Sequence, residues 1–169
     1  VEVWRAAISR QDGPTVMAFT RQNLPVLDRS ILKPASGVLK GGYTLWESGD
    51  SPQVVIIATG SEVHIALEAG QTLEREDIAA RVVSMPSWEL FDDQPKDYRD
   101  QVLPPSLRAR VSVEAGATKG WERYVGLDGA TVGMNNYGAS APAGVLYEKF
   151  GITAERVVEE ARKLVSGAS

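Results

Sequence analysis

Cysteine is absent from the 169-residue chain, and histidine occurs once, as His64. Without cysteine the chain cannot form disulfides, use a thiolate nucleophile, or bind zinc or an iron–sulfur cluster through sulfur. A single histidine also excludes a site with several histidine ligands in one chain, and a Ser–His–Asp site would have to use His64. His64 belongs to no catalytic motif, so we expect a surface or boundary residue rather than a general base.

Long hydrophobic runs and an excess of positive charge are absent too. No window approaches the roughly 18 apolar residues of a membrane span, and the N-terminus lacks a signal-peptide pattern, so we expect a soluble, cytoplasmic protein without membrane contact. The chain has 18 Lys and Arg against 22 Asp and Glu, a net charge of −4, which argues against nucleic acid as a partner. It begins with Val1 instead of Met, and we expect it to be a piece of a longer protein.

Residues 1–40 do not predict a closed core. Apolar residues at helical spacing over Val3–Ile8 predict a helix, and Thr15–Thr20 reads as a short buried strand. The segment from Gln22 to Lys40 has the proline and glycine content of a linker. We therefore assign residues 1–22 to the end of one domain, 23–40 to a linker and 41–169 to a second domain.

In the second domain, strands and helices alternate. Val54–Ala58 is a continuous apolar run, which is typical of a strand covered on both faces in a parallel sheet. A helix with one apolar face follows it, and another begins near Thr153. The remaining expected elements are an edge strand over Lys40–Glu47, strands over Ala80–Met85, Arg110–Glu114 and Ala130–Met134, and short helices within Ser87–Leu103 and Trp121–Tyr124. This order predicts a three-layer α/β/α fold with a mostly parallel sheet of about five strands and one antiparallel edge strand.

Several turns could carry chemistry, and each has a plainer interpretation. Thr59–Glu62 joins a strand to a helix but lacks the glycine-rich phosphate-binding motifs, and Glu62 would repel a phosphate, so we interpret this turn as helix capping. The loops Glu114–Trp121 and Asn135–Pro142 follow strands, where α/β folds place ligands, but each could equally be structural. Asp92 and Asp93 lie in a polar stretch and predict a solvated face.

Arg21 is the strongest candidate for ligand binding. It ends the apolar run Thr15–Thr20 and is followed by Gln22 and Asn23, so its guanidinium emerges from apolar surroundings in a way that suits anion binding. The alternative is a salt bridge within the linker.

Five segments, in this order, resemble the C-terminal part of transketolase. The Ser84–Asp92 string is the most specific, because related thiamine-diphosphate enzymes such as deoxyxylulose-phosphate synthase and the pyruvate dehydrogenase family share the fold but not this string. The five segments are Thr20–Pro25, Ala58–Val63, Arg81–Asp92, Val113–Gly116 with Gly120 and Trp121, and Tyr137–Pro142.

The resemblance implies that residues 1–22 end the pyrimidine-binding domain and that 41–169 form the C-terminal domain. It implies a parent homodimer in the pentose phosphate pathway that uses thiamine diphosphate and Mg²⁺ to transfer a two-carbon ketol unit between sugar phosphates. The family's magnesium motif, cofactor-activating glutamate and active-site histidines have no counterpart here. We therefore expect no catalytic, cofactor-binding or metal-binding residue in this chain. Only Arg21 matches a family site position, the arginine that binds the sugar phosphate group.

The chain alone is therefore expected to be inactive, with a structural and dimer-supporting role, and its partners are the rest of the transketolase chain, a second copy and, in the intact enzyme, sugar phosphates. Two alternatives stay open. The chain could be a free-standing α/β module that binds a nucleotide or anion at the strand ends around Gly60, Gly116 and Gly138. It could also come from deoxyxylulose-phosphate synthase, which the Ser84–Asp92 string disfavours.

Overall fold

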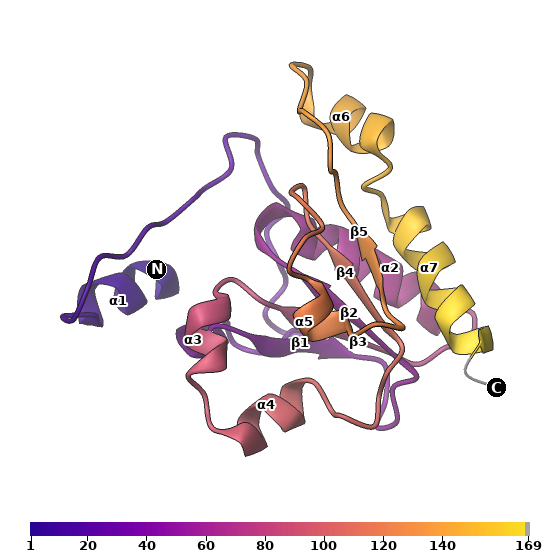
Figure 1. The fold of residues 1–169 in the computed structure, drawn as a ribbon, viewed down its shortest axis with the longest axis horizontal. Coiled ribbons are helices and arrows are strands. Elements are labelled where there is room, and N and C mark those ends of the chain that lie inside the picture. Colours follow the sequence, from indigo (N-terminus) through magenta and orange to yellow (C-terminus); the bar gives the residue numbers. More distant parts are fainter. Residues whose placement is uncertain (168–169) are drawn as a thin grey trace.

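The computed structural model of the chain describes residues 1–167. A five-stranded sheet forms its centre, with helices on both faces and an N-terminal arm that leads to a helix away from the sheet, which contacts residues 35–40 (Figure 1). In chain order the elements are α1 (Glu2–Ser9), the 3-10 helix η1 (Ala35–Lys40), β1 (Tyr43–Glu47), β2 (Val54–Ala58), the 3-10 helix η2 (Gly60–Glu62), α2 (Val63–Glu74), β3 (Ala80–Ser84), α3 (Trp88–Asp92), α4 (Lys96–Val102), β4 (Arg110–Val113), α5 (Glu122–Val125), β5 (Ala130–Val132), α6 (Ala143–Phe150) and α7 (Ala154–Gly167).

The sheet has the order β1-β3-β2-β4-β5. β1 pairs antiparallel with β3, and the other three pairings are parallel. The predicted fold class, including the antiparallel edge strand, is confirmed. β2 is central and all five of its residues are buried, which explains why its sequence is apolar without alternation.

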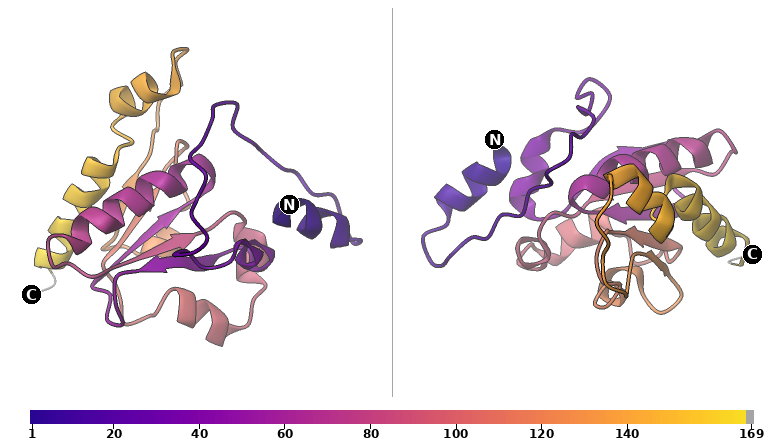
Figure 2. Two further views of the ribbon diagram at one scale, coloured as in Figure 1. Left: turned by 180° about the vertical axis from the view of Figure 1, so that it is seen from behind. Right: turned by 90° about the horizontal axis from the view of Figure 1, so that it is seen from above.

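Each face of the sheet has its own hydrophobic core. Val54, Ile56 and Ala58 of β2 pack against α2 and α7, whereas Val55 and Ile57 pack on the opposite side against α3, α4 and α5. Figure 2 shows the two helical layers from behind and from above. In the second core Phe91 and Trp121 are 2% and 0% exposed. Within the Ser84–Asp92 string, Phe91 is fully buried, whereas Trp88 and Leu90 are half-buried.

The predicted strand at Thr15–Thr20 is wrong. The helix expected over Val3–Ile8 is present as α1, but the segment that follows it is unpaired, with Val16 94% and Phe19 64% exposed. A strand needs a neighbour for its backbone N–H and C=O groups, and no segment within residues 1–167 pairs with this one. The apolar character of Thr15–Thr20 favours a strand but does not show whether a neighbouring strand is present to pair with it.

Part of the expected linker is ordered against the domain. η1 occupies its second half, Leu32 is 7% exposed in the core, and Gly37 lies so close to Tyr43 that an added Cβ would come within 2.3 Å of the ring. The division of the chain at residues 22 and 40 stays a prediction.

The sequence interpretation missed α6, which lies between β5 and α7. None of its eight residues is fully buried, and Tyr147 and Phe150 pack only partly buried against the core, so its apolar signal in the sequence is short. Two signals bracket it: Pro142 lies at the N-cap, and Gly151 ends it in the left-handed conformation, with φ of 66°. Proline at the start and glycine just past the end are typical of helix boundaries.

Candidate functional site

A cleft of about 470 Å³ opens at the carboxyl edge of the sheet, where β2, β4 and β5 end. α6 forms one wall, and the N-terminal segment 18–22 lies across it. Open α/β sheets place ligands at this edge. The polar residues that line the cleft are Thr20, Gln22, Thr59, Ser61, Glu62, Glu114 and Tyr147.

Glu62 is the most buried charged group at this edge, with 4% of its surface exposed. Its carboxylate accepts hydrogen bonds from the Ser61 hydroxyl at 2.6 Å, the Tyr147 phenol at 2.7 Å and the Ala115 backbone N–H at 3.1 Å. The interpretation of Thr59–Glu62 as side-chain helix capping is therefore wrong, because neither η2 nor α2 has a capping bond from its N-cap side chain. The carboxylate instead binds donors from the loop after β4 and from α6.

Tyr147 connects this carboxylate to the N-terminal segment. Its phenol accepts a hydrogen bond from Gln22 Nε2 at 3.3 Å. Burial first, together with the hydrogen bond to Glu62 and the charge of that carboxylate, raises the pKa of the Tyr147 phenol above its ordinary value. The hydroxyl therefore keeps its proton at neutral pH.

Arg21 itself is exposed, next to Gln22. No ion pair within residues 1–167 uses its guanidinium, so the linker salt bridge that was the alternative interpretation is not formed by the described residues. Its neighbours Thr20 and Gln22 line the cleft, whereas Arg21 does not.

Hydrogen bonds hold the two other candidate loops, Glu114–Trp121 and Asn135–Pro142, internally and to each other. Trp121 Nε1 donates to Glu114 at 2.8 Å, and Asn135 Oδ1 accepts from the Thr118 backbone N–H at 3.1 Å and from its hydroxyl at 2.9 Å. These bonds favour the structural interpretation of both loops. Because Glu62 and Glu114 both line the cleft, its interior suits a phosphate or nucleotide poorly.

His64 lies beside this network without joining it. The residue is half-buried, and its ring meets the Tyr147 ring edge-on, with 6.5 Å between centroids. This agrees with the boundary position expected from the sequence.

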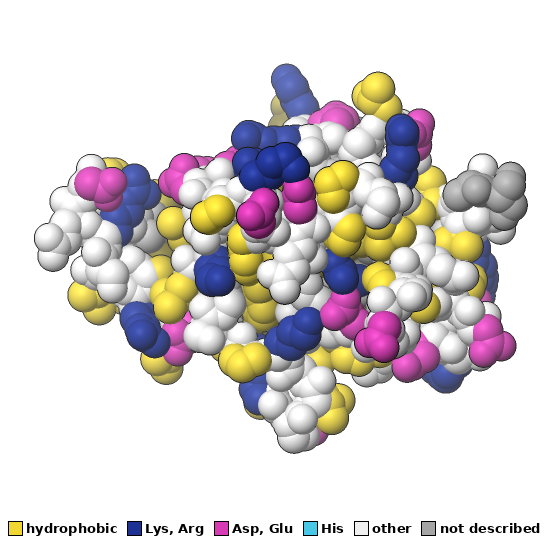
Figure 3. All heavy atoms as spheres, turned by 90° about the horizontal axis from the view of Figure 1, so that it is seen from below, with side chains coloured by type: hydrophobic (Ala, Val, Ile, Leu, Met, Phe, Trp, Pro, Cys, Tyr) yellow, Lys and Arg dark blue, Asp and Glu magenta, His cyan; other side chains and the backbone are white. Residues whose placement is uncertain are grey.

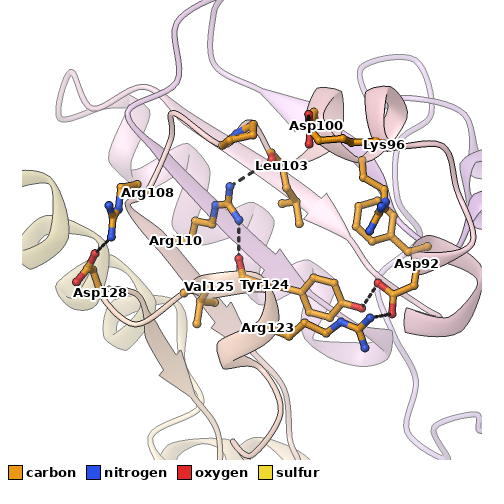
Figure 4. Close-up of a pocket in the computed structure, with 14 residues that line it drawn as sticks. Asp92, Lys96, Asp100, Leu103, Arg108, Arg110, Arg123, Tyr124, Val125 and Asp128 are labelled. Atoms are coloured by element: carbon orange, nitrogen blue, oxygen red, sulfur yellow. Dashed lines mark hydrogen bonds and ion pairs between the residues drawn. The ribbon is translucent and has the colours of Figure 1, made fainter.

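A second pocket, also of about 470 Å³, lies among α3, α4, α5 and the start of β4 (Figure 4). Five basic side chains line it, but most are paired: Arg123 with Asp92 at 2.7 Å, Lys96 with Asp100, and Arg108 with Asp128. Arg110 points its guanidinium at four backbone carbonyls, those of Leu103, Pro104, Leu107 and Tyr124. Four of the five basic groups in this pocket are therefore occupied by protein partners.

Asp92 corrects a further prediction. It was expected on a solvated face with Asp93, but its side chain is only 21% exposed and accepts a hydrogen bond from the Tyr124 phenol at 3.1 Å. Burial first, then the bond to Asp92, raises the pKa of Tyr124. Asp93 is exposed, as expected.

Charge is well mixed on the underside of the molecule. Figure 3 shows Lys and Arg side chains interspersed with Asp and Glu across that face. Within residues 1–167 no three potential His, Asp or Glu ligands converge on one point, and no helix of this part is long and apolar enough to cross a bilayer.

Comparison with known proteins identifies this kind of domain. Residues 41–153 match the family model described as "Transketolase-like TK C-terminal domain". The fold is thus that of a transketolase-type C-terminal domain, and the chain belongs to the transketolase family. The resemblance drawn from the five sequence segments is confirmed.

Three relatives illustrate the similarity. The chain is 47% identical over 162 residues to transketolase 1 of Escherichia coli K12, covering 96% of this chain and 24% of that protein. It superposes on transketolase from Leishmania mexicana with a TM-score of 0.88 at 45% identity, covering 98% of this chain and 23% of that one. It superposes on a Pichia stipitis transketolase in complex with sedoheptulose 7-phosphate with a TM-score of 0.87 at 38% identity, again covering 98% and 23%.

The chain spans only part of the length of these proteins. It covers between 24% and 31% of curated relatives such as the E. coli enzyme and the chloroplastic transketolase of Craterostigma plantagineum.

Proposed function

We propose that this chain acts as the C-terminal portion of a thiamine-diphosphate-dependent transketolase, in which it supports the assembly and supplies one substrate contact, Arg21. The reaction is transfer of a two-carbon ketol unit from a ketose phosphate to an aldose phosphate in the pentose phosphate pathway. The observation that carries this proposal is the match to transketolases over almost the whole chain, including one in complex with a ketose phosphate.

The exposed apolar surface of the N-terminal region supports a further polypeptide as partner. Of the eleven large hydrophobic residues that are exposed, eight lie within residues 1–31, among them Trp4 and Ile8 of α1. Such a concentration marks a surface that another protein surface covers. In the proposal, residues 1–22 are the end of the pyrimidine-binding domain and pack against the rest of that domain.

The cofactor and its metal are assigned to the rest of the enzyme. Residues 1–167 offer no cluster of ligands for Mg²⁺, so these residues do not fit a metal–diphosphate site. No catalytic step is therefore assigned to this chain. We expect the chain alone to show neither ketol transfer nor calorimetrically detectable thiamine diphosphate binding with Mg²⁺, and micromolar binding would contradict this part of the proposal.

Arg21 carries the substrate contact in the proposal. Its guanidinium is exposed and without an ion-pair partner among the described residues, which suits a planar donor that receives a phosphate in two parallel hydrogen bonds. The proposal also includes a homodimer, sugar phosphates as substrates and the cytoplasm as location.

Replacement of the matching segment in a working enzyme tests this function. The segment of E. coli transketolase 1 that aligns with this chain is exchanged for residues 1–167, and ketol transfer and cofactor binding are measured. We expect an active, cofactor-binding enzyme. A matched control carries Arg21→Ala in the same exchange. A folded, cofactor-loaded hybrid without ketol transfer would contradict the proposal.

A further inference from the structure

Arg21 lies between two residues that are tied to the carboxyl edge by a relay of hydrogen bonds. The Thr20 hydroxyl donates to Gln22 Oε1, and Gln22 Nε2 donates to the Tyr147 phenol at 3.3 Å. The phenol in turn donates to Glu62 Oε1 at 2.7 Å. The backbone on both sides of Arg21 is therefore held to the domain through one amide side chain.

The direction of each bond in the relay is fixed by its buried end. An ionised carboxylate can only accept, so the Tyr147 hydroxyl must donate to Glu62, and its oxygen is left to accept from Gln22. The amide then turns its NH₂ to Tyr147 and its oxygen to the Thr20 hydroxyl. The Thr20 and Tyr147 hydroxyls and one amide hydrogen of Gln22 each find an acceptor, which favours one arrangement of the segment.

The anchor at the far end of the relay is rigid. Glu62 is 4% exposed and is also held by the Ala115 backbone N–H and the Ser61 hydroxyl. Tyr147 comes from α6, none of whose residues is fully buried. The Tyr147 ring packs against the hydrophobic core, whereas its hydroxyl makes the two bonds of the relay.

We propose that Tyr147 is a positioning residue for Arg21, which fixes the guanidinium where a substrate phosphate is received and so lets the C-terminal domain set the affinity for phosphorylated substrates. This inference rests on the proposed function of Arg21. A donor that is misplaced by about 1 Å loses much of its effect, so release of the segment should weaken phosphate binding while the reacting centre, formed elsewhere, is unaffected.

Tyr147→Phe in the transketolase holoenzyme that carries this chain tests the proposal. KM and kcat are measured for sedoheptulose 7-phosphate and for hydroxypyruvate as donors, with one short, non-phosphorylated aldehyde as acceptor, so that the donor carries the only phosphate. We expect KM for the phosphorylated donor to rise about 3- to 10-fold, with kcat and the hydroxypyruvate KM within about twofold of the parent enzyme. Gln22→Met, which leaves the Tyr147–Glu62 bond in place, should give the same selective rise.

Two further variants make the outcome decisive. Tyr137→Phe is the matched control, because Tyr137 is 99% exposed, and it should change nothing. Arg21→Ala tests the phosphate role itself, and Tyr147→Phe added to Arg21→Ala should raise KM for the phosphorylated donor no further.

If Arg21→Ala raises KM only for the phosphorylated donor and Tyr147→Phe does not, the positioning role is wrong while the function of Arg21 stands. If Arg21→Ala shows no selectivity, the proposed function of Arg21 itself fails. Equal losses on both donors in Tyr147→Phe would show a merely structural role.

Discussion

Arg110 should contribute more to the stability of the domain than any exposed arginine in the chain. It begins β4, and its guanidinium donates to the carbonyls of Tyr124 at 2.7 Å and Leu103 at 3.2 Å (Figure 4). It also donates to the carbonyls of Leu107 at 2.8 Å and Pro104 at 2.7 Å. One side chain thus joins the end of α4, the loop after it and the end of α5. No acidic side chain within residues 1–167 pairs with it.

The loss expected for Arg110→Met follows from these four bonds. A hydrogen bond to a charged group contributes about 1.5–3 kcal/mol, so four independent bonds would give a ceiling of about 6–12 kcal/mol. Two effects make the actual loss smaller than this ceiling. In the variant, water can enter the open pocket and hydrogen-bond to the carbonyls. In the parent chain, burial of the guanidinium costs desolvation free energy and lowers the pKa of Arg110. We expect a net loss of about 2–4 kcal/mol.

Urea unfolding of the 169-residue chain measures this loss. With a slope of about 1–3 kcal/mol per molar urea, the midpoint should fall by roughly 1–2 M. Arg110→Lys keeps the charge, but its ammonium group cannot reach four acceptors. Its urea midpoint should lie between those of the parent chain and Arg110→Met. The matched control is Arg108→Met, whose 76% exposed side chain pairs with the exposed Asp128 and should cost no more than about 0.5 kcal/mol. An Arg110→Met midpoint equal to that of Arg108→Met would refute the reasoning.

Two further predictions concern β1 and the turn before it. Burial disfavours the ionised form of Glu47, but the hydrogen bonds and charges of Lys33 and Arg81 outweigh it and hold its pKa below the ordinary value of 4.5. The stability that the ionised Glu47 contributes is present above pH 4.5 and is lost as the pH falls below it. Glu47→Gln should therefore make the free energy of unfolding depend less on pH in this acid range. An unchanged pH dependence would contradict the ion-pair account. Gly41→Ala should destabilise far more than Gly49→Ala. Both glycines have positive φ, 78° and 97°, but a Cβ at Gly41 would lie 2.2 Å from Phe91 N, whereas at Gly49 it meets nothing within 4 Å. Conformational strain alone costs about 1–2 kcal/mol, and equal urea midpoints for the two variants would show that the turn at Gly41 can move.

The fold could be predicted because its signals are local. The apolar run Val54–Ala58 identified the central strand, and the apolar face after Val63 identified the helix that covers it. The segment Thr15–Thr20 carries the same signal, but whether a strand forms depends on a neighbour, which no local pattern contains.

The site could be predicted only in part. Arg21 follows from its sequence context and the family resemblance and stays a prediction, whereas the relay that holds its segment was not predicted. Glu62 and Tyr147 lie 85 positions apart, and Tyr147 belongs to a short helix that the sequence analysis did not predict. The capping rule failed at Glu62 for the same reason, since donors distant in sequence took up the carboxylate.

The central claim is that Arg21 receives the phosphate of the sugar substrate, and one comparison of donors tests it most directly. In the holoenzyme that carries this chain, Arg21→Ala is assayed with sedoheptulose 7-phosphate and with hydroxypyruvate, using one non-phosphorylated acceptor. Loss of a hydrogen bond to a charged group, about 1.5–3 kcal/mol, predicts a KM for the phosphorylated donor that is roughly tenfold or more higher, and little change with hydroxypyruvate. Equal losses with both donors would contradict the claim, because Arg21 would then support the fold or the reacting centre instead of the phosphate.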